Sequence, residues 1–219
     1  MKRNEEIVER ILGHYERSWH PEITDPFKSL VRTILSQNTN GRNQTMAFRR
    51  LESAVGITPE NIAEVDVRRI REAIRPAGMH NQRSNTLKSV AEAVIQRFDG
   101  DLNPVMNKPY PEARRDLMDL PGVGPKTADV VLMFVAGKEI VPVDRHIFRI
   151  SKRLGIVPDK AAYDEVRLAL EAATPLGRRE DIHVLLMQFG REICRARARK
   201  PPRAERRIPH TMGEIPSQR

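Results

Sequence analysis

Two short stretches carry charged side chains at the expected starts of helices, where they could bind or act on a ligand. The first, residues 117–131, reads L-M-D-L-P-G-V-G-P-K-T-A-D-V-V. Gly122 and Gly124 allow a tight turn that brings bare backbone close to a ligand, and Pro125 suits the first turn of a new helix. The N–H groups and positive dipole end of that helix would bind phosphate oxygens beside Lys126. The stretch therefore indicates a phosphate-binding hairpin with a lysine next to it.

The second stretch, residues 143–149, reads V-D-R-H-I-F-R and places Asp144 after a loop that contains a proline. A carboxylate at this point is a good N-cap for the helix that follows.

The hairpin at residues 117–131 also has a plainer alternative, in which Gly-x-Gly only turns the chain and Lys126 is a surface lysine. Both alternatives stay open on the residues alone, although the full string L-P-G-V-G-x-K-T-A is far more specific than a lone Gly-x-Gly.

The apolar residues around these stretches follow a helical period. Residues 27–35 and 87–98 place apolar side chains three or four positions apart, as helices packed on a core do. Strand signals are poor, and the best strand candidate, residues 141–143, contains a proline that favours a loop. We expect an all-α protein of about ten short helices. Residues 24–26, Thr-Asp-Pro, have the pattern of a helix N-cap.

The composition excludes several classes of protein. The 219 residues suffice for one domain or two small ones, and the formal charge of +9 favours a polyanionic partner. A single cysteine rules out a disulfide framework and a metal site built from several thiolates. There is no apolar run of about 18–20 residues and no signal-peptide pattern. We therefore expect a cytoplasmic protein that does not bind membranes.

The C-terminal region concentrates positive charge. Residues 191–207 hold eight Lys or Arg against two Glu, which accounts for a net six of the nine charges. Such a segment is either a solvated basic tail or an arm that contacts the backbone of a nucleic acid.

Three further stretches join residues 143–149 in extending the pattern: residues 35–40, 77–83 and 189–194, which read L-S-Q-N-T-N, A-G-M-H-N-Q-R and F-G-R-E-I-C. With the hairpin string they resemble, over about residues 20–195, the endonuclease III family of helix–hairpin–helix DNA glycosylases. The resemblance implies an all-α fold of two helical domains with the DNA cleft between them. Its expected boundaries are a six-helix barrel over 20–138 with the hairpin at 117–131, a second domain from 1–19 and 139–195, and a basic tail over 196–219.

The resemblance also assigns the chemistry. Lys126 matches the family's nucleophile, which attacks C1′ of the sugar, expels the base and forms a Schiff base, and β-elimination then nicks the strand 3′ to the lesion. Asp144 matches the essential carboxylate, which stabilises the cationic sugar and assists proton transfer. Gln37 would fill the gap left by the flipped nucleotide and Met79 would wedge on the opposite strand. Without the resemblance, Met79 is loop packing and Gln37 a helix-end cap.

The residues expected to contact DNA come from residues 35–40 and 77–83, the hairpin, the Asp144 segment and the basic C-terminal region. They are Gln37, Met79, His80, Asn81, Arg83, Gly122, Val123, Gly124, Thr127, Arg145, Arg195 and Arg197. His146 and Arg149 would support the Asp144 segment. Carbonyl groups near the hairpin glycines would hold a monovalent cation.

The sequence departs from the family at the iron–sulfur loop. Counted from Cys194, the other three cluster positions hold Pro201, Ala204 and His210, so three thiolates are missing. We expect no iron–sulfur cluster and no other metal, with the basic tail binding phosphates in place of the cluster loop.

These residues together predict a monomeric, nucleoid-associated repair enzyme that acts on damaged double-stranded DNA. Because lysine at position 126 marks the family's bifunctional members, we expect a glycosylase with apurinic/apyrimidinic lyase activity that removes oxidised pyrimidines such as thymine glycol. The alternatives are a monofunctional glycosylase for mismatched uracil or thymine, and a non-catalytic helix–hairpin–helix DNA-binding module.

Overall fold

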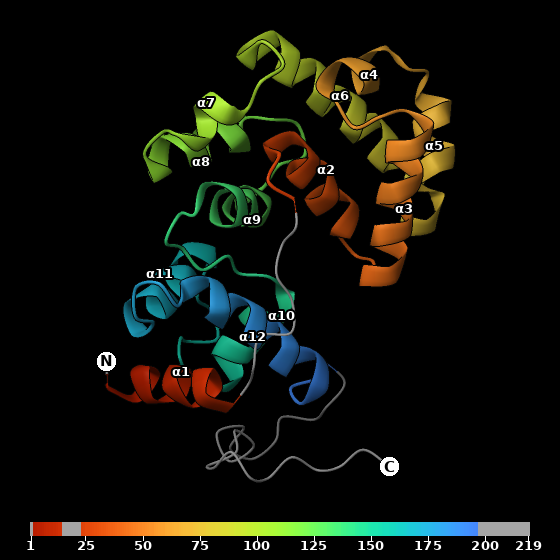
Figure 1. Cartoon of the computed structure of the whole chain (residues 1–219). Helices are drawn as coiled ribbons and strands as arrows, with labels where there is room; N and C mark the ends of the chain where they lie inside the picture. The colour runs from red at the N-terminus through yellow and green to blue at the C-terminus, as the bar shows by residue number, and fades with distance from the viewer. Residues whose placement is uncertain (1, 15–22, 197–219) are drawn as a thin grey trace. The chain divides into compact units, whose positions relative to one another are not determined.

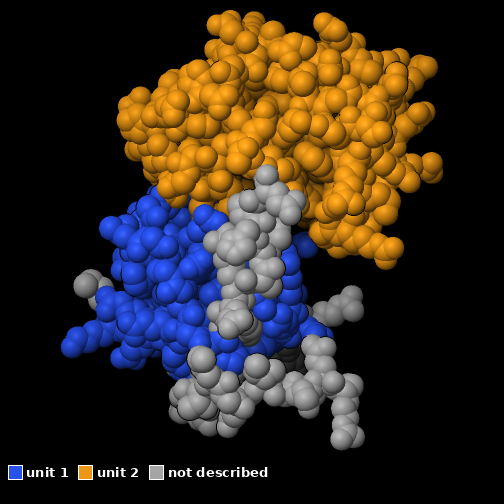
Figure 2. Space-filling view, in the orientation of Figure 1, with its two compact units in different colours: residues 1–20, 139–219 blue, residues 21–138 orange. Residues whose placement is uncertain are grey.

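A computed structural model of the chain describes residues 2–14 and 23–196 (Figure 1). All regular structure in these residues is helical, which confirms the predicted all-α fold. The chain divides into two compact units, Met1–His20 with Glu139–Arg219 and Pro21–Lys138, coloured separately in Figure 2. The boundaries expected from the resemblance lie after residues 19 and 138, and these divisions fall after residues 20 and 138.

The Pro21–Lys138 unit contains six helices of eight residues or more and two shorter ones. They are α2 (Pro26–Ser36), α3 (Gly41–Ala54), α4 (Pro59–Glu64), α5 (Val67–Ile74), α6 (His80–Phe98), α7 (Asn103–Met106), α8 (Tyr110–Met118) and α9 (Pro125–Ala136), with a 3-10 turn, η1 (Arg75–Ala77), after α5. Asp25 caps α2 as expected, since its carboxylate accepts the Lys28 N–H at 2.7 Å.

The core of this unit lies where α2 packs against α9 and where α4 and α5 pack against α6. Leu30, Val31 and Leu35 of α2 are fully buried, as is Leu132 of α9. The predicted apolar stripe of residues 27–35 is thus the buried face of α2, and it holds the helix that begins at the glycine turn.

The other unit combines the N-terminal helix with the C-terminal third of the chain. Its helices are α1 (Lys2–His14), α10 (Arg145–Arg153), α11 (Tyr163–Ala173) and α12 (Arg179–Glu192). α1 packs against α11 and α12, and α10 packs against α12. Gly190 permits the last contact, because a Cβ there would lie 2.8 Å from the Cβ of His146.

Candidate active site

The predicted hairpin is formed by α8, a short turn and α9. Gly122 has φ +71°, and a Cβ on it would lie 2.7 Å from Cγ2 of Thr86 on α6, so glycine is required for both reasons. Val123 donates its N–H to the carbonyl of Leu120 at 3.2 Å, which closes the turn. Gly124 is the N-cap of α9, in extended backbone that leaves the helix start without a capping side chain.

Lys126 is the second residue of α9 and is half-buried. Its neighbour Thr127 accepts a hydrogen bond from Gln37, whose Nε2 lies 3.5 Å from the Thr127 hydroxyl. Gln37 is itself the C-cap of α2, with its N–H on the carbonyl of Ile34, as the plainer interpretation expected. The fold thus brings Gln37 to the first turn of α9, although the two are 90 positions apart in the sequence.

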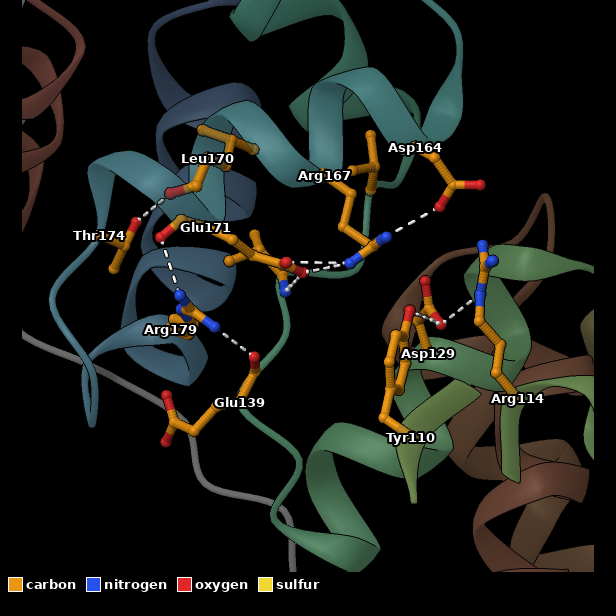
Figure 3. A network of polar contacts seen from close by, with 12 residues as sticks. Tyr110, Arg114, Asp129, Glu139, Asp164, Arg167, Leu170, Glu171, Thr174 and Arg179 are labelled. Atoms are coloured by element: carbon orange, nitrogen blue, oxygen red, sulfur yellow. Dashed lines mark hydrogen bonds and ion pairs between the residues drawn. The ribbon is translucent and has the colours of Figure 1, made fainter. Parts of the chain in front are cut away.

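A buried ion pair locks the two helices of the hairpin together. The carboxylate of Asp129 is fully buried, and its Oδ1 accepts hydrogen bonds from Tyr110 Oη and Arg114 Nε of α8, both at 3.0 Å (Figure 3). None of the motifs in the sequence predicted this network. The one available signal was an aspartate inside the apolar run of residues 128–133, where an unpaired charge would be costly.

The loop before α6 carries the second expected insertion residue. Met79 is 50% exposed and adopts a left-handed backbone with φ +47°, and Gly78 before it has φ +73°. A non-glycine residue in this region is strained by about 1–2 kcal/mol, and such strain concentrates at functional sites. His80 is half-buried and Asn81 is exposed at the start of α6.

Arg83 does not lie where the sequence analysis placed it. It was expected to contact DNA, but its side chain is 4% exposed and Nη1 donates to the carbonyls of Ala77 and Gly78. Burial lowers the pKa of this guanidinium. Arg83 therefore supports the Met79 loop from beneath, because two carbonyls oriented by η1 and the turn draw it into the unit rather than toward solvent.

Asp144 is the N-cap of α10, so the capping interpretation is confirmed. Its Oδ1 accepts the N–H groups of His146 and Ile147, both at 2.8 Å. Within the described part of the chain Oδ2 makes no hydrogen bond, so half of the carboxylate is available for a second role. Arg145, the next residue, is exposed.

The segment that leads into Asp144 is fixed at successive residues by side chains from α11 and α12. Val141 donates its N–H to Oε1 of Glu171 at 3.1 Å, and Val143 donates to Oη of Tyr163 at 3.2 Å. The Pro142 carbonyl accepts from Nδ1 of the buried His183 at 2.8 Å.

Arginines complete this anchoring. Arg167 holds Glu171 through Nη1, which lies 2.9 Å from each carboxylate oxygen, and Arg179 donates to the carbonyls of Glu139 and Glu171 (Figure 3). Residues 139–143, of which the sequence predicted 141–143 as a loop, are thus held by side chains of α11 and α12.

α10 also holds the end of α12 and the residues after it. Arg149 donates to the carbonyls of Gly190 and Cys194 at 3.0 and 2.7 Å, and Arg153 donates to the carbonyls of Arg195 and Ala196 at 2.8 and 3.3 Å. Arg149, which was expected to support the Asp144 segment, thus contacts the end of α12.

His146 lies beside this contact. Burial lowers the pKa of His146, the charge of Asp144 opposes that shift, and the nearby Arg149 lowers it further.

The residues present do not fit a four-iron cluster. Cys194, the single cysteine of the sequence, is 5% exposed and its Sγ accepts a hydrogen bond from Arg153 at 3.5 Å. No three His, Cys, Asp or Glu side chains gather as metal ligands in residues 2–14 and 23–196. Arg195 is exposed, whereas Arg197, Pro201, Ala204 and His210 lie outside the described residues.

A glycine turn between two locked helices, with a half-buried lysine at the start of the second, defines the helix–hairpin–helix class of DNA-binding proteins. Residues 31–175 match the model of the HhH-GPD superfamily of base excision DNA repair proteins, and the chain belongs to this family. It is an endonuclease III-like base excision repair glycosylase that binds DNA. No helix in the described residues is long and apolar enough to cross a bilayer.

Relatives and solved structures agree with this assignment. The chain is 32% identical to endonuclease III of Thermotoga maritima, with 87% of this chain and 84% of the relative covered, and 34% identical to endonuclease III of Sulfolobus acidocaldarius, with 78% and 75% covered. A trapped covalent intermediate of endonuclease III with DNA superposes with a TM-score of 0.73 at 26% identity over 90% of this chain and 87% of that one. A thermostable thymine-DNA glycosylase superposes with a TM-score of 0.77, also at 26% identity, over 94% and 92%.

Proposed function

We propose that the protein is a bifunctional glycosylase that removes oxidised pyrimidines from duplex DNA and then cleaves the strand. The observation that carries the proposal is Lys126, an amine at the start of α9, beside Thr127 and its partner Gln37. An amine can form a Schiff base with the sugar, whereas a monofunctional enzyme uses water as its nucleophile and requires no amine at this position.

In the proposed reaction the Lys126 amine, in its uncharged form, attacks C1′ of a flipped nucleotide. The C1′–N bond breaks, the base leaves with its bonding electrons and takes up a proton, and ring opening gives a Schiff base between Nζ and C1′. Loss of a C2′ proton then expels the 3′ phosphate, which nicks the strand. Asp144 would stabilise the positive charge that develops on the sugar through its Oδ2, while Oδ1 keeps α10 capped.

The proposed reaction uses no iron–sulfur cluster, because the chain supplies one thiolate where such a cluster needs four. Gln37 would fill the gap left when the nucleotide leaves the stack, and Met79 would wedge into the opposite strand. Both side chains are exposed on the Pro21–Lys138 unit, and each lies at or beside a residue with positive φ, Asn38 and Met79.

Borohydride trapping on a duplex with thymine glycol tests the proposal. We expect a covalent complex with wild type and none with Lys126→Ala, and we expect Asp144→Asn to slow base release by about a hundredfold or more. Base release that needs alkali for strand cleavage, with no trapped complex, would instead support the monofunctional alternative, which the similarity to the thymine-DNA glycosylase favours. DNA binding without base release on any lesion tested would leave only a binding module.

A further inference from the structure

The exposed face of α3 is a basic surface that the proposed reaction does not use. Arg42, Met46, Arg49 and Arg50 are exposed and lie on one side of the helix, because their spacings of four, seven and eight positions return to the same face. With Gly41 and Thr45 they line a shallow groove of about 500 Å³. We call these residues the α3 face.

The charges of the α3 face are not neutralised by the described part of the chain. Arg42, Arg49 and Arg50 form no ion pair or side-chain hydrogen bond with it, and no exposed residue of α3 is acidic. The one carboxylate of the helix, Glu52, is paired with Lys28 at 2.6 Å and also accepts the N–H of Ile57.

Several other basic side chains of the unit do meet carboxylates, as in the pairs of Arg97 with Asp119 and Lys108 with Asp116. The α3 face presents three guanidinium groups to solvent that have no counter-charge among the described residues. Such a group of arginines attracts a polyanion.

α3 is connected to both loops that carry the proposed insertion residues. The chain runs from Gln37 through residues 38–40 directly into α3, and the Asn40 side chain caps the helix by accepting the Asn43 N–H at 2.9 Å. η1, which leads to Met79, packs against α3. α3 thus follows the loop of Gln37 in the chain and packs against the turn that leads to Met79. Its exposed face and the two loops belong to the same unit.

We propose that the α3 face binds phosphates of the duplex that flank the damaged nucleotide. The inference rests on the proposed DNA substrate and adds a contact surface to it. Arginine suits the task because its guanidinium donates two parallel hydrogen bonds to phosphate oxygens. Arg42 and Arg50 are separated by about 12 Å along the helix axis, which corresponds to about three or four nucleotides of B-form DNA at 3.4 Å per base pair.

The test compares two double variants that remove the same charge from adjacent exposed arginines. Arg49→Gln/Arg50→Gln alters the α3 face, and Arg68→Gln/Arg69→Gln alters exposed arginines of α5 that lie outside it. Dissociation constants for a lesion-containing duplex are measured over a range of salt concentrations. We expect the salt slope of the α3 variant to fall by about 0.9 for each lost phosphate contact, and that of the α5 variant to stay at the wild-type value.

Shortened duplexes locate the contact. When the flanks are trimmed on each side of the lesion in turn, we expect the difference between wild type and the α3 variant to disappear once about four base pairs remain on the contacted side. Base-release rates at saturating protein should match the wild type, because the α3 face lies outside the groups assigned to catalysis.

Three results would overturn the inference: an unchanged salt slope in the α3 variant, an equal loss in both variants, or a difference that does not depend on flank length. An unchanged salt slope would mean that the α3 face does not contact DNA phosphates. An equal loss in both variants would mean that only the net charge of the protein matters. Failure of the proposed function is distinct from all three, because wild type itself would then form no trapped complex, whether or not it released base.

Discussion

The two residues proposed to act on the sugar are positioned in different ways. Lys126 belongs to a hairpin whose determinants lie within a few residues, since Gly122, Gly124 and Pro125 set the turn and begin the helix. Asp144 begins its helix by an equally local cap, but the segment before it is fixed by side chains 20 to 41 positions away. Local residues of the hairpin therefore position the Lys126 amine, whereas tertiary contacts fix the segment that leads into Asp144.

This difference has a physical cause. A turn with positive φ admits few residue types, so its conformation is encoded where it occurs. Residues 139–143 form no helix or strand, and Val141, Pro142 and Val143 are buried, so their backbone groups need partners that only other elements can supply. Tyr163, Glu171 and His183 are those partners. Three measurements would sharpen or break the comparison.

The largest effect is expected from Glu171→Ala, in the segment that depends on tertiary contacts. The change leaves the buried Arg167 without its main partner and the Val141 N–H without an acceptor, which we expect to cost about 3 kcal/mol of unfolding free energy. Chemical denaturation gives the loss, and single-turnover base release below the transition shows whether Asp144 has shifted.

Two matched variants separate the causes. Glu171→Gln keeps the shape and the acceptor for Val141. Asp164→Asn removes the charge of the half-exposed partner of the same arginine, and we expect this change to cost less than about 1 kcal/mol. If Glu171→Ala cost no more than Asp164→Asn, the claim that side-chain contacts fix the approach to Asp144 would be wrong.

A smaller effect is expected in the hairpin from Gly122→Ala. The left-handed backbone costs an alanine about 1–2 kcal/mol, and its Cβ would meet Thr86 at 2.7 Å, so we expect a total loss of about 2 kcal/mol. The double variant Gly122→Ala/Thr86→Ser lacks the obstructing methyl group. It should recover only the part of the lost stability that comes from the overlap with Thr86, and not the part that comes from the left-handed backbone. Thermal and urea unfolding of the two variants measure both.

Gly124→Ala is the internal control for the hairpin. Gly124 has ordinary extended backbone and no atom within 4 Å of an added Cβ, so we expect its unfolding free energy to stay within about 0.5 kcal/mol of wild type. Equal losses for the two glycines would show that the turn is not determined by the conformation of Gly122.

The smallest effect is a pH dependence at the contact of α10 with α12. Because burial lowers the pKa of His146 in the folded protein, the unfolded state binds the proton more tightly. The stability contributed by the neutral His146 is therefore fully present above pH 6.5, about the pKa of histidine in the unfolded state, and it falls as the pH drops through that value. The ring is only partly buried, so we expect the loss between pH 7 and 5 to stay under about 1 kcal/mol.

His146→Gln should remove this slope, measured as the difference in urea unfolding free energy across the same pH range. Protonation would also cost the hydrogen bond that Nδ1 accepts from Arg149 at 3.1 Å. A slope that persists in the variant would place the titrating group elsewhere.

The sequence by itself determined the helical fold, the glycine turn, the start of α9 at Pro125 and the N-caps at Asp25 and Asp144. Each of these depends on interactions within a few residues or on a repeat of three to four positions, which can be recognised without knowing what packs nearby.

Only the tertiary structure decided which polar groups are buried and what they bind. Arg83 follows a polar loop in the sequence, which predicted a surface position, yet its side chain is buried beneath that loop. The charge of the buried Asp129 is paired with Arg114 from another helix. The segment before Asp144 likewise draws its partners from α11 and α12. Burial and pairing depend on which distant elements meet, and a charged side chain reads the same in the sequence whether it ends in solvent or in an ion pair.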